Sequence, residues 1–172
     1  MMNPLRGLWL TISVILVLAV ACMAFVAPAS AQGRLGPSLS SVLILRDGNV
    51  ERGQAIGAFY EYQTHLDDLG QNWLGIMAQV SGTSEDILAG LGLRYYREVG
   101  TIYPGIGIVG SILDVESSPV EEMTFMLGFD VLIELNLTEN SAVALRAGAQ
   151  WPVAGDMGIT MVPLAVDIPV GL

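Results

Sequence analysis

Apolar and polar side chains alternate along the stretch from Glu122 to Asn136. The even positions include three carboxylates and a glycine, and the odd positions are Met123, Phe125, Leu127, Phe129, Val131, Ile133 and Leu135. A period of two indicates a β-strand, whose side chains point to opposite faces in turn. The stretch exceeds the roughly 9–11 residues with which a tilted strand crosses a bilayer. We therefore predict a strand with lipid on its apolar face and a polar barrel lumen on the other.

The same alternation predicts seven further strands. The first is the weakest prediction, because Val42 to Leu45 is an apolar run without alternation. Asp, Asn and Gly are frequent between the predicted strands, and these residues favour turns. The seven predicted ranges are 39–46, 55–65, 72–81, 87–97, 102–115, 141–151 and 158–170.

Glycines of the predicted strands gather on the face that carries the charges. Gly110 falls on the apolar face, whereas the charged face holds Gly57, Gly75, Gly90, Gly92, Gly105, Gly107, Gly128 and Gly148. Glycine is unfavourable inside a strand unless something else needs the space. The lumen of an eight-stranded barrel is just wide enough to be filled by side chains. We therefore expect these glycines to make room for large inward side chains such as Arg94 and Tyr96.

The N-terminus has the pattern of a secretory signal peptide over residues 1–31. Arg6 precedes an apolar run at 8–26, and Ala29-Ser30-Ala31 suits a signal peptidase. An uncleaved membrane anchor and a lipoprotein signal ending at Cys22 are the alternatives. Removal of the signal leaves 141 residues, enough for one domain. We expect a short lead at 32–38 and a single barrel domain at 39–172.

The predicted mature chain is strongly acidic. It keeps all 17 Asp and Glu residues and six of the seven arginines and has no lysine, so its formal charge is −11. This charge argues against nucleic acid or an anionic membrane surface as a partner. The single cysteine, Cys22, lies in the signal, so no disulfide can stabilise the mature domain. Closure of a hydrogen-bonded barrel is another way to stabilise it.

With its signal peptide, eight amphipathic strands, outward aromatics and inward charges, the chain resembles the small eight-stranded outer-membrane barrels of the OmpA-like type. The resemblance covers Leu39 to Leu172 and rests on pattern. It implies an all-β, antiparallel, up-and-down transmembrane barrel, with both termini facing the periplasm. It also implies a monomer surrounded by outer-membrane lipids and inserted by the barrel assembly machinery. The chain departs from this type because it ends in Val170-Gly171-Leu172 rather than an aromatic residue, and because none of its loops is long.

Six charged residues share the inward face: Glu61, Arg94, Asp130, Glu134, Arg146 and Asp167. A charge buried alone is very costly, so we expect hydrogen-bonded pairs that form an ionic plug. Four acids against two arginines leave a cation-preferring pore as a further interpretation. If the family topology holds, aromatic residues mark both membrane interfaces. They are Tyr60, Tyr62 and Tyr95 toward the periplasm, and Phe125 and Trp151 toward the outside.

Few residues of the sequence could serve in catalysis or metal binding. A lipid-modifying barrel enzyme would need a serine or histidine dyad with a carboxylate. His65 is the only histidine, and the inward Ser81 and Ser111 are well separated from it in sequence. We therefore assign no catalytic residue. One histidine and no mature cysteine exclude the common zinc sets, and Asp67-Asp68 suits a solvated turn, so we expect no metal or cofactor.

Two functions remain open at this point. The first is an outer-membrane protein with a structural or envelope-integrity role and a closed lumen. The alternative is a soluble periplasmic barrel that binds an apolar ligand, as lipocalin-like proteins do. Such a carrier would line its interior with Phe125, Leu127 and Phe129. The glycine-rich polar face and the absence of lysine favour lipid on the outside.

Overall fold

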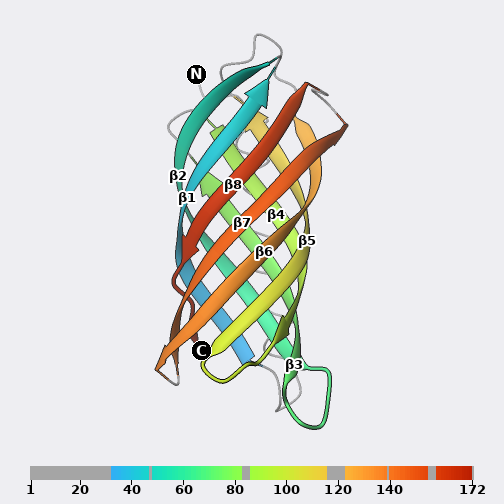
Figure 1. Cartoon of the computed structure of the whole chain (residues 1–172). Helices are drawn as coiled ribbons and strands as arrows, with labels where there is room; N and C mark the ends of the chain where they lie inside the picture. Colours follow the sequence, from blue (N-terminus) through green and yellow to red (C-terminus); the bar gives the residue numbers. More distant parts are fainter. Residues whose placement is uncertain are drawn as a thin grey trace.

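The computed structural model describes residues 32–46, 48–82, 86–115, 123–138, 140–154 and 158–171. These residues form one closed antiparallel sheet (Figure 1). Its strands are β1 (Gln32–Arg46), β2 (Asn49–His65), β3 (Asn72–Gly82), β4 (Asp86–Arg97), β5 (Ile102–Val115), β6 (Thr124–Thr138), β7 (Ser141–Ala154), β8 (Ile159–Asp167) and β9 (Val170–Gly171). The predicted signal peptide lies outside the described residues. Within the described part, no helix is long and apolar enough to cross a membrane.

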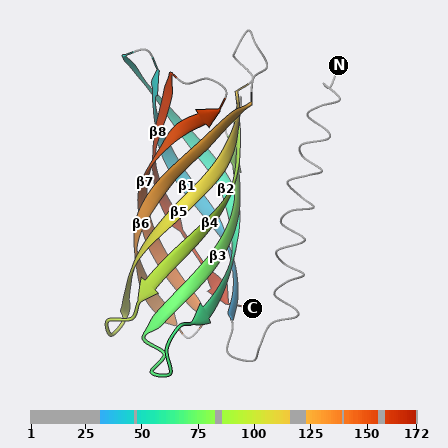
Figure 2. The same cartoon turned by 90° about the vertical axis from the view of Figure 1, so that its right-hand side faces the viewer.

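The ring closes because β1 pairs with β2 on one side and with β8 on the other. The short β9 pairs with the same neighbours as β8, namely β1 and β7, and extends it after a break at Pro169. None of the eight long strands is therefore left with a free edge. Figure 2 shows the barrel from the side. The predicted eight-stranded antiparallel barrel is confirmed.

Strand stagger can be followed through pairs of inward residues around the ring. The path returns to β1 ten residues beyond its start, through Arg34, Glu61, Met77, Gly92, Val109, Gly128, Gln150, Met161 and Ile44. With eight strands, this stagger tilts each strand by about 40° from the barrel axis. The steep tilt is visible in Figure 1.

The alternation places apolar side chains on the outside of the ring. In β6 the even positions from Thr124 to Glu134 are buried and the odd ones are exposed. The outward apolar residues of this strand are 42–64% exposed, and they are Phe125, Leu127, Phe129, Val131, Ile133, Leu135 and Leu137. At about 3.3 Å per residue and a tilt of about 40°, this row makes an apolar band roughly 30 Å tall. That height matches the hydrocarbon core of a bilayer.

The first strand is longer than predicted. It begins at Gln32, so residues 32–38, which we expected to form a lead, pair with β2. Their side chains already alternate, since Arg34 and Ser38 are buried while Leu35 and Leu39 are exposed. Pro37 is tolerated because β8 ends opposite Ser38. The Pro37 carbonyl instead accepts a hydrogen bond from the amide of Ile168.

The second strand also starts earlier, at Asn49 rather than Ala55. Residues 49–54, which lie between two of the predicted strands, pair with Ser41–Arg46. Gly48 has a φ of +81°, a left-handed conformation that suits a tight turn. Beyond the apolar band both faces of the hairpin are exposed to water. The two strands therefore remain paired although their apolar and polar side chains no longer alternate. The alternation therefore marked the part of this strand that lies within the apolar band and missed its extension.

Inward glycines lie against neighbouring side chains and backbone. An added Cβ at Gly107 would meet Asp130 Oδ1 at 2.5 Å and Arg94 Cγ at 2.7 Å. At Gly128 it would collide with the Ala149 carbonyl oxygen and lie 2.7 Å from Gln150 Cα. The outward Gly110 has no atom within 4 Å of its added Cβ. Space inside the ring is therefore the reason for the inward glycines.

We expect Gly128→Ala to lower the free energy of unfolding by about 1–3 kcal/mol, because backbone cannot move aside as a flexible side chain can. Urea unfolding of the barrel in lipid vesicles measures the loss. The matched control is Gly110→Ala, which should change stability by no more than about 0.5 kcal/mol. Equal losses for the two variants would contradict this account of the lumen.

Candidate functional site in the barrel lumen

Seven charged side chains are buried inside the described barrel. None of these residues is more than 9% exposed, and they are Arg34, Glu61, Arg94, Asp130, Glu134, Arg146 and Asp167. They project inward because each occupies an inward position of β1, β2, β4, β6, β7 or β8. All six residues of the predicted lumen set are among them. The seventh, Arg34, was not identified from the sequence.

Arg34 and Glu134 form the first ion pair. The guanidinium Nη2 of Arg34 lies 2.5 Å from Glu134 Oε2. We missed Arg34 because the segment around Pro37 was taken as a lead, although Arg34, Gly36 and Ser38 alternate there with apolar residues. The structure brings three arginines to four acids, so the lumen carries less uncompensated negative charge than the sequence suggested.

Arg94 is central to the second group of charges. It donates to Asp130 Oδ2 through Nη2 at 2.8 Å and Nε at 3.3 Å, while its Nη1 lies 3.9 Å from Glu61 Oε1. Glu61 accepts hydrogen bonds from two neutral side chains. The Tyr96 hydroxyl donates to Oε1 at 2.5 Å and the Gln63 amide to Oε2 at 3.2 Å. Glu61 is thus held mainly by neutral donors, whereas Asp130 is held by a guanidinium.

Arg146 forms the third group. Its Nε donates to Asp167 Oδ2 at 3.0 Å and its Nη1 to Gln79 Oε1 at 2.9 Å. Ser38 donates to the other oxygen of Asp167 at 2.5 Å. Arg146 Nη1 also lies 3.8 Å from Asp130 Oδ2, which links this group to the second. The three groups therefore place charges from six strands in one part of the lumen, and the second and third groups are linked through Asp130.

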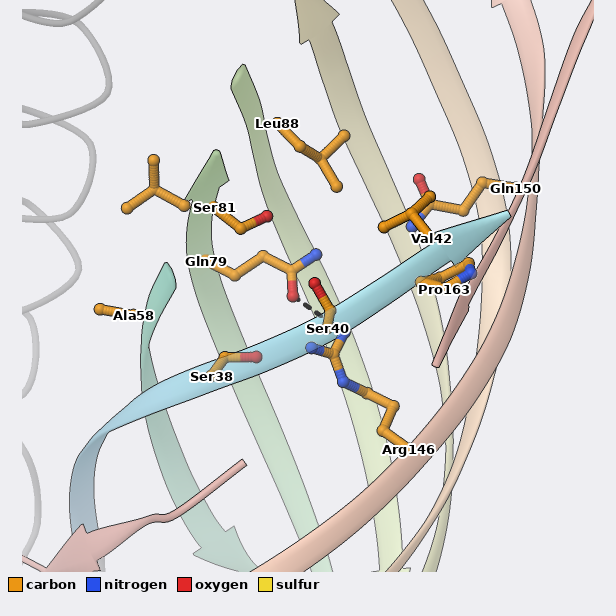
Figure 3. A pocket seen from close by; sticks show the side chains of 11 residues that line it. Ser38, Ser40, Val42, Ala58, Gln79, Ser81, Leu88, Arg146, Gln150 and Pro163 are labelled. Carbon is orange, nitrogen blue, oxygen red and sulfur yellow. Dashed lines mark hydrogen bonds between the residues drawn. The ribbon is translucent and has the colours of Figure 1, made fainter. Parts of the chain in front are cut away.

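A small polar cavity adjoins Arg146 (Figure 3). Gln79 and Arg146 point toward each other beside it, and Ser38, Ser40 and Gln150 also line it. Its volume is about 10 Å³, room for about one water molecule. The arrangement leaves no space for a ligand there.

The other end of the lumen is apolar, which the sequence analysis did not predict. Inward side chains pack there into one cluster of Val42, Leu88, Leu113, Met126, Ile159 and Met161. A second cavity of about 30 Å³ lies against this cluster. These residues occupy the even positions of β1, β4 and β6 and the odd positions of β5 and β8, so the strand parity was the signal that could have revealed them. The described lumen is therefore closed by charges in one part and by packed methyl groups in another.

No protein-family model and no curated protein matches the sequence. Solved structures do match it. Neisserial surface protein A aligns with a TM-score of 0.57 and 10% identity over 81% of this chain and 97% of that one. The attachment invasion locus protein Ail of Yersinia pestis aligns with a TM-score of 0.51 and 10% identity, over 83% and 97%. The chain has the fold of the small eight-stranded outer-membrane β-barrels. At this identity the likeness concerns the fold alone.

Within this outer-membrane barrel fold, three of the aromatic residues predicted at the interfaces are exposed on the outside. Tyr95, Phe125 and Trp151 have exposed fractions of 40%, 43% and 46%. Tyr60 and Tyr62 lie near the same end of the barrel as Tyr95, since β2 and β4 run in the same direction. Tyr62 is half-buried, and Tyr60 is only 4% exposed. These two tyrosines pack with Ala78.

The structure does not bring His65 to either candidate serine. Ser81 pairs with Gly57, eight residues before His65 on β2, which corresponds to about 26 Å along the strand. Ser111 donates to Gln150, and the His65 ring contacts the Trp73 ring, with ring centroids 3.5 Å apart and the planes tilted by 40°. The described residues therefore contain no serine–histidine dyad of these groups. They also contain no cluster of three or more His, Cys, Asp or Glu that could hold a metal ion.

Asp67 organises the turn between β2 and β3. Desolvation raises the pKa of its carboxyl group, but hydrogen bonds from Asn72, Gln71 and Gly70 together outweigh it, and the pKa lies below the usual Asp value. The Gln71 and Asn72 amides donate to Oδ1 at 2.9 and 3.2 Å. The stabilisation of this turn is therefore fully present above the ordinary Asp pKa and is lost as the pH falls through the lowered one. Asp67 has a structural role here.

We expect Arg94→Met to be strongly destabilising, by about 3–5 kcal/mol, because it leaves the carboxylates of Glu61 and Asp130 buried without their guanidinium. The free energy of urea unfolding in lipid vesicles measures this loss. Arg52→Met is the matched control, since Arg52 is exposed and, among the described residues, donates to the Ser41 hydroxyl. It should cost at most about 0.5 kcal/mol. A similar cost at both positions would show that the buried charges do not stabilise the barrel.

Proposed function

We propose that this chain is an outer-membrane β-barrel with a structural, envelope-integrity role and a lumen closed by a salt-bridge plug. One observation carries the proposal: the side chains outside the ring form an apolar band about as tall as a bilayer core, while the charges lie inside. The predicted signal peptide would direct export. The proposed surroundings are outer-membrane lipids, and the barrel assembly machinery would insert the chain as a monomer.

The geometry does not favour the alternative of an apolar-ligand carrier. Phe125, Leu127 and Phe129, which would line the pocket of such a carrier, are 43–53% exposed on the outside. Small-molecule sites usually enclose about 300–1,000 Å³, whereas the two lumen cavities hold about 10 and 30 Å³. A carrier would need a different packing of the lumen.

A pore is also not favoured. Ions crossing the barrel would have to pass Arg34, Arg94 and Arg146, each bonded to at least one carboxylate. Toward the other end they would meet the apolar cluster of Val42, Leu88, Leu113, Met126, Ile159 and Met161. Breaking buried ion pairs costs several kcal/mol each. We therefore propose that the barrel does not conduct.

Expression with the signal peptide in a Gram-negative host, followed by fractionation and gel electrophoresis of boiled and unboiled samples, tests the proposal. We expect the protein in outer membranes, with the unboiled form migrating as a compact barrel. Reconstitution in planar bilayers should give no steady conductance. Release by osmotic shock as a soluble species would overturn the outer-membrane location. Steady conductance of the folded barrel would overturn the plug and leave the location intact.

A further inference from the structure

Strand β8 is paired unevenly with its two neighbours, β1 and β7 (Figure 1). On the β1 side every residue of β8 has a partner. On the β7 side the pairs are continuous only as far as Ala147 with Leu164, and beyond them one pair, Gln150 with Met161, joins the described parts of the two strands. The ladder between β3 and β4, by contrast, is continuous over the whole of β3. The boundary between β7 and β8, here called the β7–β8 seam, is therefore interrupted in one half.

Two prolines account for the interruption. Proline has no amide hydrogen to donate to a ladder, so within sheets it is usually confined to edges and bulges. Pro163 of β8 pairs with Val42 on the β1 side but has no ladder partner on β7. Pro152 of β7 pairs with Met126 on the β6 side but has no ladder partner on β8. Both prolines therefore weaken the same half of the same seam.

The other half of the β7–β8 seam is held by an ion pair as well as by the ladder. Arg146 of β7 and Asp167 of β8 both lie in the continuously paired stretch. Arg146 Nε donates to Asp167 Oδ2 at 3.0 Å. Breaking a buried pair of this kind costs several kcal/mol. Separation of the two strands is therefore strongly opposed at this end.

Behind the interrupted half, the lumen is apolar. Ile159 and Met161 of β8 and Met126 of β6 point inward there and belong to the apolar cluster. Separation of β7 from β8 in this half would bring these side chains into contact with lipid chains, which are as apolar as the cluster itself. It would leave the buried ion pairs of the lumen intact. Separation here therefore costs less than at a continuously paired seam.

We propose that the barrel opens laterally toward lipid between β7 and β8, at the apolar end of the lumen. In the open state β8 stays paired with β1, and the ion pair between Arg146 and Asp167 keeps the other half of the seam closed. Local opening from the native state takes place where few hydrogen bonds and contacts oppose it. This inference rests on the proposed function, because a lateral opening of this kind requires a barrel surrounded by lipid.

Thiol modification of single cysteines in the folded barrel, reconstituted in lipid vesicles, tests the proposal. Met161→Cys places the thiol behind the interrupted half, and Met77→Cys on the continuously paired β3 is the matched control. The two methionines are 2% and 0% exposed. We expect an apolar maleimide dissolved in the lipid to modify Met161→Cys and to leave Met77→Cys largely unmodified. A charged maleimide in the surrounding water should modify neither, because it cannot enter from the lipid.

Restoring an amide donor should hold the seam closed. We expect Pro163→Ala to slow the modification of Met161→Cys by the apolar reagent roughly fivefold, as one regained ladder hydrogen bond would. Pro104→Ala is the control, because Pro104 of β5 lies beyond the last pair with β4, which joins Tyr96 and Gly105. It should leave the rate unchanged.

Amide hydrogen exchange of the unmodified barrel is a second measurement that needs no cysteine. Residues 159–164 of β8 should exchange faster than residues 74–79 of β3, because opening of the seam exposes their amides. Exchange of the two segments at the same rate would overturn the proposal even if neither cysteine variant assembled.

Three results of the thiol experiment would also overturn it. One is equal modification of the two cysteine variants by the apolar reagent, and another is a Met161→Cys rate that Pro163→Ala leaves unchanged. The third is equally fast modification of Met161→Cys by the charged reagent, which would show entry through the mouth of the barrel. The proposed function stands in each case if the barrel still fractionates with outer membranes. Release as a soluble species would instead remove the lipid on which this inference rests.

Discussion

The requirement that every backbone amide and carbonyl be hydrogen-bonded within the chain governs this structure. A strand edge exposed to lipid would leave such groups unsatisfied at a cost of several kcal/mol each. Pairing of β1 with both β2 and β8 removes the edge. Closure with eight strands then fixes a narrow lumen. Every inward side chain has to fit inside that space.

The narrow lumen explains why its composition is so particular. Arginine and glutamate fit only where a neighbouring position is glycine. Gly107 makes this room beside Arg94 and Asp130, and Gly75 makes it beside Glu61. Once inside, each charge needs a partner, because the cost of burying it alone exceeds most other terms in stability. Linked ion pairs between different strands also oppose a slip in register, since a shift by one residue would turn these charges toward lipid.

The main features of the fold could be predicted from the sequence because the outside of the barrel and its lumen impose opposite demands on alternate residues. The parity of Phe125 and Asp130 was sufficient to place one outside and one inside, and the structure agrees. Parity alone did not reveal which charges meet. Partners such as Arg34 and Glu134 are one hundred residues apart in the chain and come together only through the stagger of the ring. Arg34 was also hidden by Pro37, which suggested a lead rather than a strand. The start of β2 was missed because alternation ends where both faces become wet.

Lipid contact along β6 tests the central claim most directly, and the absence of cysteine from the predicted mature chain makes it easy to measure. Single cysteines placed from Phe129 to Glu134 would carry a fluorophore in the folded barrel, in vesicles that contain brominated lipids. We expect strong quenching at Phe129, Val131 and Ile133. At the even positions, Asp130, Leu132 and Glu134, we expect little quenching in the variants that fold. Quenching at the even positions, or quenching without any alternation, would contradict the account.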